Sequence, residues 1–262
     1  MKKVILITGA SSGIGLQMAN ALHQAGHEVY GTSRNPEKHN VDFKMVAMDV
    51  QSEAAIAEGV QQVLNKAGKI DVLINNAGIW LVALVEETPA AQAKAQFETN
   101  FFGPLAIMQA VLPSMRQRRS GHIINISSIA GLISMPGSGV YGATKHALEG
   151  LTKSLYYELK PFNIQVSSIK PANFKTEIRH RILHGENPIA AYNTIRTTVE
   201  EENYKFVSQG ADPKLAADLI VDVVQSSKPK LHYYVGPSAR LTPFIQLFPR
   251  ILDRLAKQFG IG

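Results

Sequence analysis

The stretch Thr8-Gly9-Ala10-Ser11-Ser12-Gly13-Ile14-Gly15 follows the apolar run Val4–Ile7 and precedes a segment with helical periodicity over residues 13–25. Its three glycines allow the backbone to turn tightly and to approach a pyrophosphate closely. A helix that begins here would offer unpaired amides and a positive dipole end to the anion. The spacing is not the G-x-G-x-x-G of many dinucleotide-binding folds, and the Gly-Lys-Ser/Thr of a P-loop is missing. The stretch therefore predicts phosphate binding between a strand and a helix.

The same alternation of apolar runs and helical segments continues along the chain. The runs are rich in Val and Ile, as in strands that are covered on both faces. They lie at Val4–Ile7, Val29–Gly31, Phe43–Met48, Val72–Ile74, Ile123–Ile126, Ile164–Ile169 and Leu231–Val235, and the helical segments lie at about 13–25, 52–67, 90–117, 140–160 and 212–226. This order predicts a parallel sheet built from right-handed βαβ units.

Composition and charge exclude several classes of protein. The chain has 262 residues, 45% of them hydrophobic and 18% charged, which is ordinary for a soluble globular protein. It has no cysteine, so disulfides, zinc–thiolate sites and cysteine nucleophiles are excluded. Residues 228–262 carry +5 of the +6 net charge, which leaves a near-neutral body without the basic groove of a nucleic-acid-binding protein. Because no apolar run suits a signal peptide or a membrane span, we expect a cytoplasmic protein.

Three further motifs follow strands or lie on a helix. Asn75-Asn76-Ala77-Gly78 comes directly after an apolar run, and Ser127-Ser128 ends another, where open α/β sheets place their ligands. Tyr141 and Lys145 are four residues apart and so share one helix face. Each motif alone has a simpler explanation, such as Asn/Gly turn chemistry or chance. Trp80 can form a pocket wall or pack in the ordinary way.

Together the motifs resemble the short-chain dehydrogenase/reductase family. TGASSGIG, NNAG, Asn100, the serine pair, YGATK and Pro171…Thr176 occur here in the family's order. The resemblance is close over about residues 3–176 and looser beyond. It implies an α/β, doubly wound Rossmann fold with about seven mostly parallel strands and helices on both faces. We expect one domain over residues 1–262 that assembles as a homodimer or homotetramer.

The resemblance also implies a role for each matching residue. Tyr141 matches the catalytic acid/base, and Lys145 matches its activator, which also holds the nicotinamide ribose. Ser128, thirteen residues before the tyrosine, matches the serine that binds the carbonyl oxygen, and Asn100 matches the asparagine of a water-linked proton path. The implied cofactor contacts are Gly9, Ser11, Ser12, Gly13, Ile14, Ser33, Arg34, Asp49, Val50, Asn76, Ala77, Gly78, Tyr141, Lys145, Pro171 and Thr176, and no metal site is expected. The chain has Pro171-Ala172 where the family usually has Pro-Gly.

The tyrosine chemistry can be stated in physical terms. A phenol with an ordinary pKa of about 10 is a poor base at neutral pH. A neighbouring ammonium and an oxidised nicotinamide both favour phenolate, and a close opposite charge lowers a pKa by roughly 1–3 units. We therefore expect Lys145 to lower the pKa of Tyr141 for alcohol oxidation. Ser128 would hold the carbonyl oxygen against the phenol.

The end of the second strand predicts the cofactor. An acidic residue there would bind the ribose 2′-hydroxyl and select NAD. Here Ser33 takes the acidic position and Arg34 follows, and no Asp or Glu occurs from Val29 to Pro36. Because an arginine suits a 2′-phosphate, the sequence favours NADP(H). The alternative is that Arg34 lies on the adenine face or in solvent.

The substrate is less closely defined. The chain is most similar to hydroxysteroid and retinol dehydrogenases, which implies a bulky apolar ketone, aldehyde or secondary alcohol. A 3-oxoacyl thioester reductase is the alternative enzyme, and a non-catalytic NADP(H)-binding regulator is the alternative of another class. Residues 174–210 are polar and irregular, with weak helical signals, and we expect a mobile substrate loop there.

Apolar residues recur at steps of three and four over residues 241–260, which predicts an amphipathic helical segment. They are Leu241, Phe244, Ile245, Phe248, Ile251, Leu252, Leu255 and Phe259, with Arg250, Arg254 and Lys257 between them. This stripe can pack on its own domain or on a partner subunit. The alternative is that it covers the substrate entrance and contacts anionic membrane surfaces.

Overall fold

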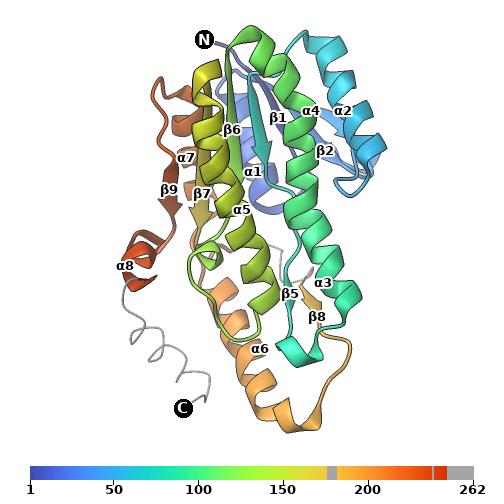
Figure 1. Cartoon of the computed structure of the whole chain (residues 1–262), viewed down its shortest axis with the longest axis vertical. Helices are drawn as coiled ribbons and strands as arrows, with labels where there is room; N and C mark the ends of the chain where they lie inside the picture. Colours follow the sequence, from blue (N-terminus) through green and yellow to red (C-terminus); the bar gives the residue numbers. More distant parts are fainter. Residues whose placement is uncertain (176–181, 238, 247–262) are drawn as a thin grey trace.

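Seven parallel strands form the central sheet of the computed structural model, which describes residues 1–175, 182–237 and 239–246 (Figure 1). The strands are β1 (Val4–Ile7), β2 (Glu28–Ser33), β3 (Lys44–Ala47), β4 (Val72–Asn75), β6 (Gly121–Ile126), β7 (Ile164–Pro171) and β9 (His232–Val235). Their order in the sheet is β3-β2-β1-β4-β6-β7-β9. The order reverses between β1 and β4, which is where an open α/β sheet binds its ligand.

Helices cover both faces of this sheet, so the predicted doubly wound fold is confirmed (Figure 1). The longer helices are α1 (Gly13–Gln24), α2 (Glu53–Ala67), α3 (Ala90–Phe97), α4 (Gly103–Arg118), α5 (Gly139–Glu158), α6 (Asn193–Ser208) and α7 (Lys214–Gln225). One core cluster lies between the sheet and α2, α4 and α5, and a second lies between the sheet and α1 and α7.

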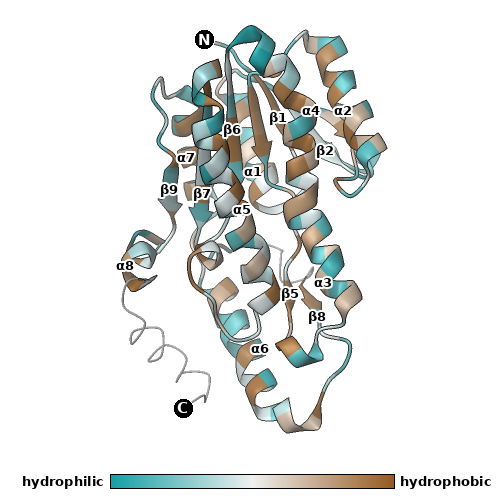
Figure 2. Ribbon diagram, viewed as in Figure 1, coloured by the Kyte–Doolittle hydropathy of each residue, from teal (hydrophilic) through white to brown (hydrophobic). Residues whose placement is uncertain are grey.

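The apolar run of β1 shows why the strands have so few polar residues. Val4 and Leu6 belong to the core cluster under α2, α4 and α5, whereas Ile5 and Ile7 belong to the cluster under α1 and α7. Successive side chains of a strand point to opposite faces, and here both faces are covered. Strand β1 is accordingly hydrophobic along its length, and three of the six residues of β6 are isoleucines (Figure 2).

The segment over residues 90–117, expected as one helix, is interrupted. Between α3 and α4 lies a π-helical turn, η3 (Glu98–Phe102), in which Thr99 and Asn100 are buried. Turns of this type widen the helix by one residue and are frequent at functional sites. The apolar periodicity continues through the turn, so periodicity alone does not detect it.

The region over residues 174–210 is more ordered than expected. Strand β8 (Leu183–His184) pairs with β5 (Leu81–Val82), and α6 fills residues 193–208. The prediction of an irregular loop is therefore wrong for its second half. Helix α6 lies beyond the carboxyl ends of the sheet (Figure 1). Its sequence is polar, but tertiary contacts hold it, because Val199 and Val207 are buried and Arg196 pairs with the buried Glu87 at 3.1 Å.

The described part of the C-terminal segment begins with η8 (Ala239–Leu241) and α8 (Thr242–Gln246). Ala239 and Thr242 are buried, whereas Leu241 and Phe244 are 59% and 62% exposed. The rest of the predicted apolar stripe lies outside the described residues. None of the described helices has the length and apolar character that a membrane crossing needs.

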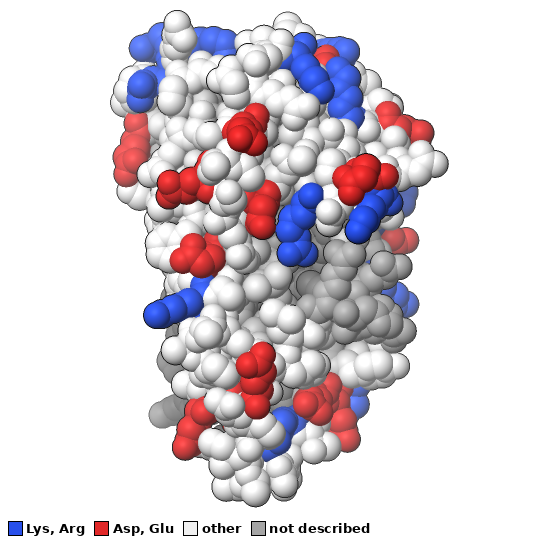
Figure 3. Space-filling view, turned by 90° about the vertical axis from the view of Figure 1, so that its right-hand side faces the viewer, with Lys and Arg blue, Asp and Glu red and all other residues white. Residues whose placement is uncertain are grey.

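On the face shown in Figure 3, Lys and Arg gather at the upper end, the end of the molecule where the chain begins in Figure 1.

Candidate active site

A cleft of about 1130 Å³ opens at the carboxyl edge of the sheet. It is lined by the turn after β1, the ends of β2, β4, β6 and β7, the start of α5, and one side of α6. The predicted site residues that line it are Gly9, Ser11, Ser12, Gly13, Ile14, Ser33, Arg34, Asp49, Val50, Asn76, Ala77, Gly78, Ser128, Tyr141, Lys145 and Pro171. Asn100 lies behind the wall, and Thr176 lies outside the described residues. Residues from distant parts of the sequence therefore share one cleft.

The glycine-rich turn forms a cradle that side chains would fill. Gly9 and Gly13 have φ angles of 66° and 58°, in the left-handed region that glycine favours. A Cβ atom on Gly15 would lie 2.3 Å from both Asn76 Nδ2 and the Gly9 carbonyl oxygen. The turn leads directly into α1, whose amino end faces the cleft. This geometry fits the pyrophosphate of a dinucleotide.

The Asn-Asn-Ala-Gly motif is bound to that cradle. The Thr8 hydroxyl accepts hydrogen bonds from the backbone amides of Asn76 and Ala77, both at 3.0 Å. The Asn76 side chain donates to the Thr8 carbonyl at 2.9 Å. The motif therefore fixes the end of β4 against the end of β1, which keeps the two loops in register at the switch point.

Ser33 and Arg34 lie at the end of β2, on the cleft wall. Ser33 is buried, whereas Arg34 is exposed. In the part of the chain that the structure describes, no carboxylate lies within ion-pair distance of the Arg34 guanidinium. Its charge is thus available to an anion in the cleft.

Ser128, Tyr141 and Lys145 form the polar centre of the cleft. Lys145 Nζ donates to the Ile126 carbonyl oxygen at 3.0 Å and lies 5.8 Å from the centroid of the Tyr141 ring. Ser128 lies at the end of β6, and its hydroxyl accepts from the Ala130 amide at 3.1 Å. The one-turn spacing on α5 and the end of β6 thus bring a hydroxyl, a phenol and an ammonium group together.

Burial changes the acidity of both groups on α5. It raises the pKa of Tyr141, an effect that a hydrogen bond with Ser128 partly opposes. It lowers the pKa of Lys145 to about 8, although the Glu149 carboxylate acts in the opposite direction. The expected lowering of the Tyr141 pKa by Lys145 is therefore not found for the protein alone, because the loss of hydration outweighs the opposing hydrogen bond with Ser128.

Asn100 occupies the π-helical turn η3 and is 1% exposed. Its side chain accepts from the Ile79 amide and donates to the Ile79 carbonyl, both at 2.9 Å, and donates to Thr144 Oγ1 at 3.2 Å. It therefore ties the loop after Gly78 to α5, one residue before Lys145.

The other half of the cleft has an apolar wall. Trp80 lies beside Tyr141, with ring centroids 5.9 Å apart. Other apolar residues of the lining are Ile129, Ile133, Met135, Leu183, Phe206 and Val207. The last three come from β8 and α6, and sequence reasoning placed a substrate loop there without naming a residue. No local motif marks them, because the pairing of β8 with β5 brings them to the cleft.

Ala172 replaces the glycine that usually follows the proline after β7. Its amide donates to the Val235 carbonyl at 2.9 Å, and its φ angle is not in the left-handed region. The backbone at this point therefore accepts a side chain without strain, and the departure from Pro-Gly leaves the cleft intact.

Comparison with known proteins identifies the family. The family described as short chain dehydrogenase matches residues 3–187. The chain belongs to this family. It is 37% identical over 241 residues to a 3-ketodihydrosphingosine reductase of Bacteroides thetaiotaomicron, a match that covers 90% of this chain and 88% of the relative. It is 33% identical to retinol dehydrogenase 8 of Bos taurus, covering 94% and 84% of the two chains.

The fold agrees with this assignment. A short-chain dehydrogenase from Streptomyces avermitilis superposes with a TM-score of 0.84 and 33% identity, covering 98% of this chain and 95% of that one. This short-chain dehydrogenase is therefore an oxidoreductase of CH–OH groups, in a fold that binds a nicotinamide cofactor.

Proposed function

We propose that the protein is an NADP(H)-dependent reductase of bulky apolar ketones or aldehydes that also oxidises the corresponding alcohols. The observation that carries the proposal is the single cleft in which Ser128, Tyr141 and Lys145 meet an apolar wall on one side and Arg34 on the other. A regulator that only senses the cofactor has no need of this acid/base arrangement.

The cleft suits a dinucleotide along its length. The cradle of Gly9, Gly13 and Gly15 would hold the pyrophosphate, Asp49 and Val50 would meet the adenine, and Lys145 would hold the nicotinamide ribose. The nicotinamide supplies or accepts the hydride. The Arg34 guanidinium would pair with a 2′-phosphate, which is the support for NADP(H) over NAD(H).

The protein's own residues then handle the proton. Ser128 and Tyr141 both donate hydrogen bonds to the carbonyl oxygen, which places the carbonyl carbon toward the cofactor side of the cleft. As charge develops on that oxygen, Tyr141 transfers its proton to it. The raised pKa keeps the phenol protonated at neutral pH, which favours the reductive direction. The Lys145 ammonium, charged below about pH 8, stabilises the phenolate that forms.

The apolar wall favours the binding of a substrate with a large hydrocarbon part. Trp80, Phe206 and Leu183 present aromatic and aliphatic surface around the reacting centre. Two of the relatives are named for 3-ketodihydrosphingosine and for retinol, which both carry long apolar chains. A long-chain ketone is accordingly the first substrate to test.

A panel assay tests the proposal. Purified protein is given long-chain ketones, retinal, a steroid ketone and a 3-oxoacyl thioester, each with NADPH and with NADH, and cofactor oxidation is followed at 340 nm. We expect the highest rates with a bulky apolar ketone or aldehyde and NADPH. Preference for the thioester would favour the alternative reductase, and cofactor binding without turnover of any substrate would favour the regulator.

We also propose that the protein is a homo-oligomer and that its C-terminal segment makes peripheral contact with membranes. The exposed Leu241 and Phe244 at the start of the segment support this. A chain that ends at Ser238 should stay folded, lose binding to anionic liposomes and lose rate on bulky substrates more than on small ones. If it instead unfolds or dissociates, and the full chain ignores anionic liposomes at low salt, the segment is structural.

A further inference from the structure

A buried ion pair lies directly behind Lys145 and has no part in the roles described above. Glu149 follows one turn later on α5 and is 3% exposed. Lys170, on β7, is fully buried, and its Nζ lies 2.9 Å from Glu149 Oε2. The pair therefore joins the helix that carries Tyr141 and Lys145 to the strand that ends at Pro171.

Further contacts complete the polar cluster around this pair. Ser168 donates a hydrogen bond to Glu149, and Lys170 Nζ donates to Ser168 Oγ and to His232 Nδ1, both at 3.0 Å. The Lys170 ammonium also lies 5.3 Å from the centroid of the Tyr234 ring. Three elements, α5, β7 and β9, therefore meet through these side chains.

The Glu149 side chain also packs under the turn that follows Ser128. A Cβ atom on Gly131 would lie 2.9 Å from Ser127 Oγ and 3.1 Å from both Glu149 Cγ and the Lys145 carbonyl oxygen. These groups thus converge on one point under the turn that follows Ser128. Glu149 accordingly pairs with Lys170 on one side and lies one helical turn from Lys145, the cation that faces the cleft.

Stability alone gives a weak reason for such a pair. Desolvation of two charges offsets most of their attraction, and apolar residues of the same volume are often as stabilising. A carboxylate beside a buried lysine has a different effect, because it favours the charged form of that lysine. Lys145 must remain charged in a place where burial disfavours the charge.

We propose that Glu149 is a positioning residue for the reaction: its buried carboxylate, held by Lys170, keeps the Lys145 ammonium charged and in place under the cleft. The catalytic part of this inference rests on the proposed function. The electrostatic part concerns Lys145 itself and can be measured without turnover.

The direction of the effect follows from the surroundings. Burial lowers the pKa of Lys145 to about 8, and Glu149 opposes this fall. Although burial by itself would raise the pKa of Glu149, Lys170 and the hydrogen bond from Ser168 hold it below its ordinary value, so Glu149 is charged at neutral pH.

The other titratable groups around the cluster are Tyr141 and Lys153 on α5, and His232 and Tyr234 on β9. Burial and Lys170 lower the pKa of His232, which is therefore neutral at pH 7. Without the Glu149 charge, the pKa of Lys145 falls further, and Lys145 loses its proton at a lower pH.

Three variants separate this role from simple packing. Glu149→Gln removes the carboxylate charge and leaves Lys170 unpaired. Glu149→Gln with Lys170→Met removes both charges but keeps the volume of the lysine stem. Asp71→Asn removes a carboxylate with ion-pair partners at the opposite end of the sheet and is the matched control.

Two readouts are taken on each protein. The first is the pH titration of Lys145, followed by its 13Cε chemical shift in lysine-labelled protein and assigned with Lys145→Met. The second is the pH profile of kcat for the ketone that the wild type reduces best. A thermal melt records stability in parallel.

We expect both Glu149 variants to titrate Lys145 at a lower pH than the wild type and to lose rate at a lower pH. The double variant should recover melting temperature that Glu149→Gln loses. Its Lys145 should still titrate at a lower pH than in the wild type. Asp71→Asn should lower the melting temperature and leave the titration unchanged. The proposal fails if Lys145 titrates at the wild-type pH in both Glu149 variants. It also fails if the titration of Lys145 shifts but the pH profile of kcat does not change. A wild type that reduces no ketone would overturn the proposed function, while the titration still tests the electrostatic part.

Discussion

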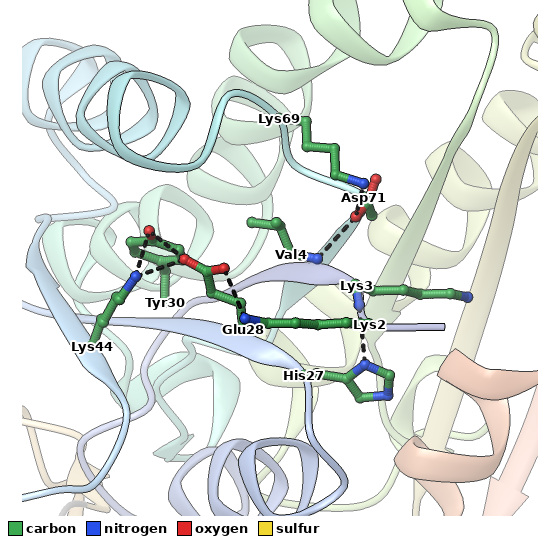
Figure 4. A network of polar contacts seen from close by, with 9 residues as sticks. All are labelled: Lys2, Lys3, Val4, His27, Glu28, Tyr30, Lys44, Lys69 and Asp71. Carbon is green, nitrogen blue, oxygen red and sulfur yellow. Dashed lines mark hydrogen bonds and ion pairs between the residues drawn. The ribbon is translucent and has the colours of Figure 1, made fainter.

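The two ends of the central sheet differ in how their charged side chains are paired. At the amino end, charged side chains pair with one another (Figure 4). Glu28 accepts from Lys44 at 2.6 Å and pairs with Lys2 at 3.3 Å, and Asp71 pairs with Lys69 at 3.0 Å. These charged groups at the amino end are therefore paired with one another.

The carboxyl end has ion pairs too, but two of its cations face the cleft. In the described part of the chain, Lys145 has no carboxylate within ion-pair distance, and its ammonium donates to a backbone carbonyl. Arg34 likewise has no carboxylate partner there. A charge paired within the fold contributes to stability, whereas a charge left facing a cleft is available to a ligand. We therefore expect substitutions of the groups that face the cleft to change binding and rate, and substitutions of the ion pairs at the amino end to change stability.

The largest effect should come from Tyr141→Phe. Loss of the phenol removes the proton donor but not the ring, so turnover should fall by roughly 10²- to 10⁴-fold. NADPH binding, measured by fluorescence titration, should change little. Turnover within tenfold of the wild type would contradict the acid/base role, and a matching loss of cofactor affinity would mean that the variant disturbs the cleft as a whole.

Arg34→Ala tests the exposed cation at the end of β2. A hydrogen bond to a charged group contributes about 1.5–3 kcal/mol, so NADPH affinity should fall roughly ten- to a hundredfold. NADH affinity should hardly change, and it serves as the internal control. Equal losses for both cofactors would show that Arg34 does not contact the 2′-phosphate.

Asp71→Asn moves the test to the amino end. The Asp71 carboxylate accepts from the Val4 amide at 2.9 Å and lies 3.3 Å from Arg118 Nη1. Because the amide keeps the shape but loses the charge, the free energy of unfolding should fall by about 1–2 kcal/mol. Denaturant titration measures this. An effect on NADPH affinity as large as that of Arg34→Ala would contradict the assignment of binding to one end of the sheet and stability to the other.

The smallest effect should come from Glu28→Gln, and it should depend on pH. Hydrogen bonds from Lys44 and Tyr30 lower the pKa of Glu28 from 4.5 to about 2. The folded state therefore gains stability from this carboxylate above about pH 4.5 and loses it as the pH falls toward 2. Since the pair is partly exposed, the gain should be below about 1 kcal/mol. The difference in unfolding free energy between the two proteins should be largest at pH 7, smaller at pH 3 and absent below about pH 2.

Much of the fold could be predicted from local sequence. The apolar run Val4–Ile7 is β1 without a change of boundary, and the helix predicted over 52–67 is α2 within one residue. Strands covered on both faces need apolar residues at every position, and this leaves a clear signal. The glycine-rich turn is equally clear, because left-handed backbone and close approach exclude most other residues.

The structure also places the predicted site residues along one cleft, apart from Asn100 behind its wall and Thr176 outside the described residues, but their electrostatics were not predictable. The spacing of Tyr141 and Lys145 determines that they share a helix face, yet their acidity depends on how far the surrounding elements exclude water. Burial raises the pKa of Tyr141 and lowers that of Lys145, and the sequence shows neither effect.

What the sequence by itself determined is whatever depends on neighbours along the chain: the strands, most of the helices, the turn and the one-turn spacing on α5. What only the tertiary structure decided depends on residues far apart. Helix α6 forms on a polar sequence because Glu87 and the β5–β8 pairing anchor its region, and Glu149 meets Lys170 only when α5 packs on β7. Local propensity is set by each residue and its near neighbours, whereas burial and ion pairing exist only after distant segments have packed together.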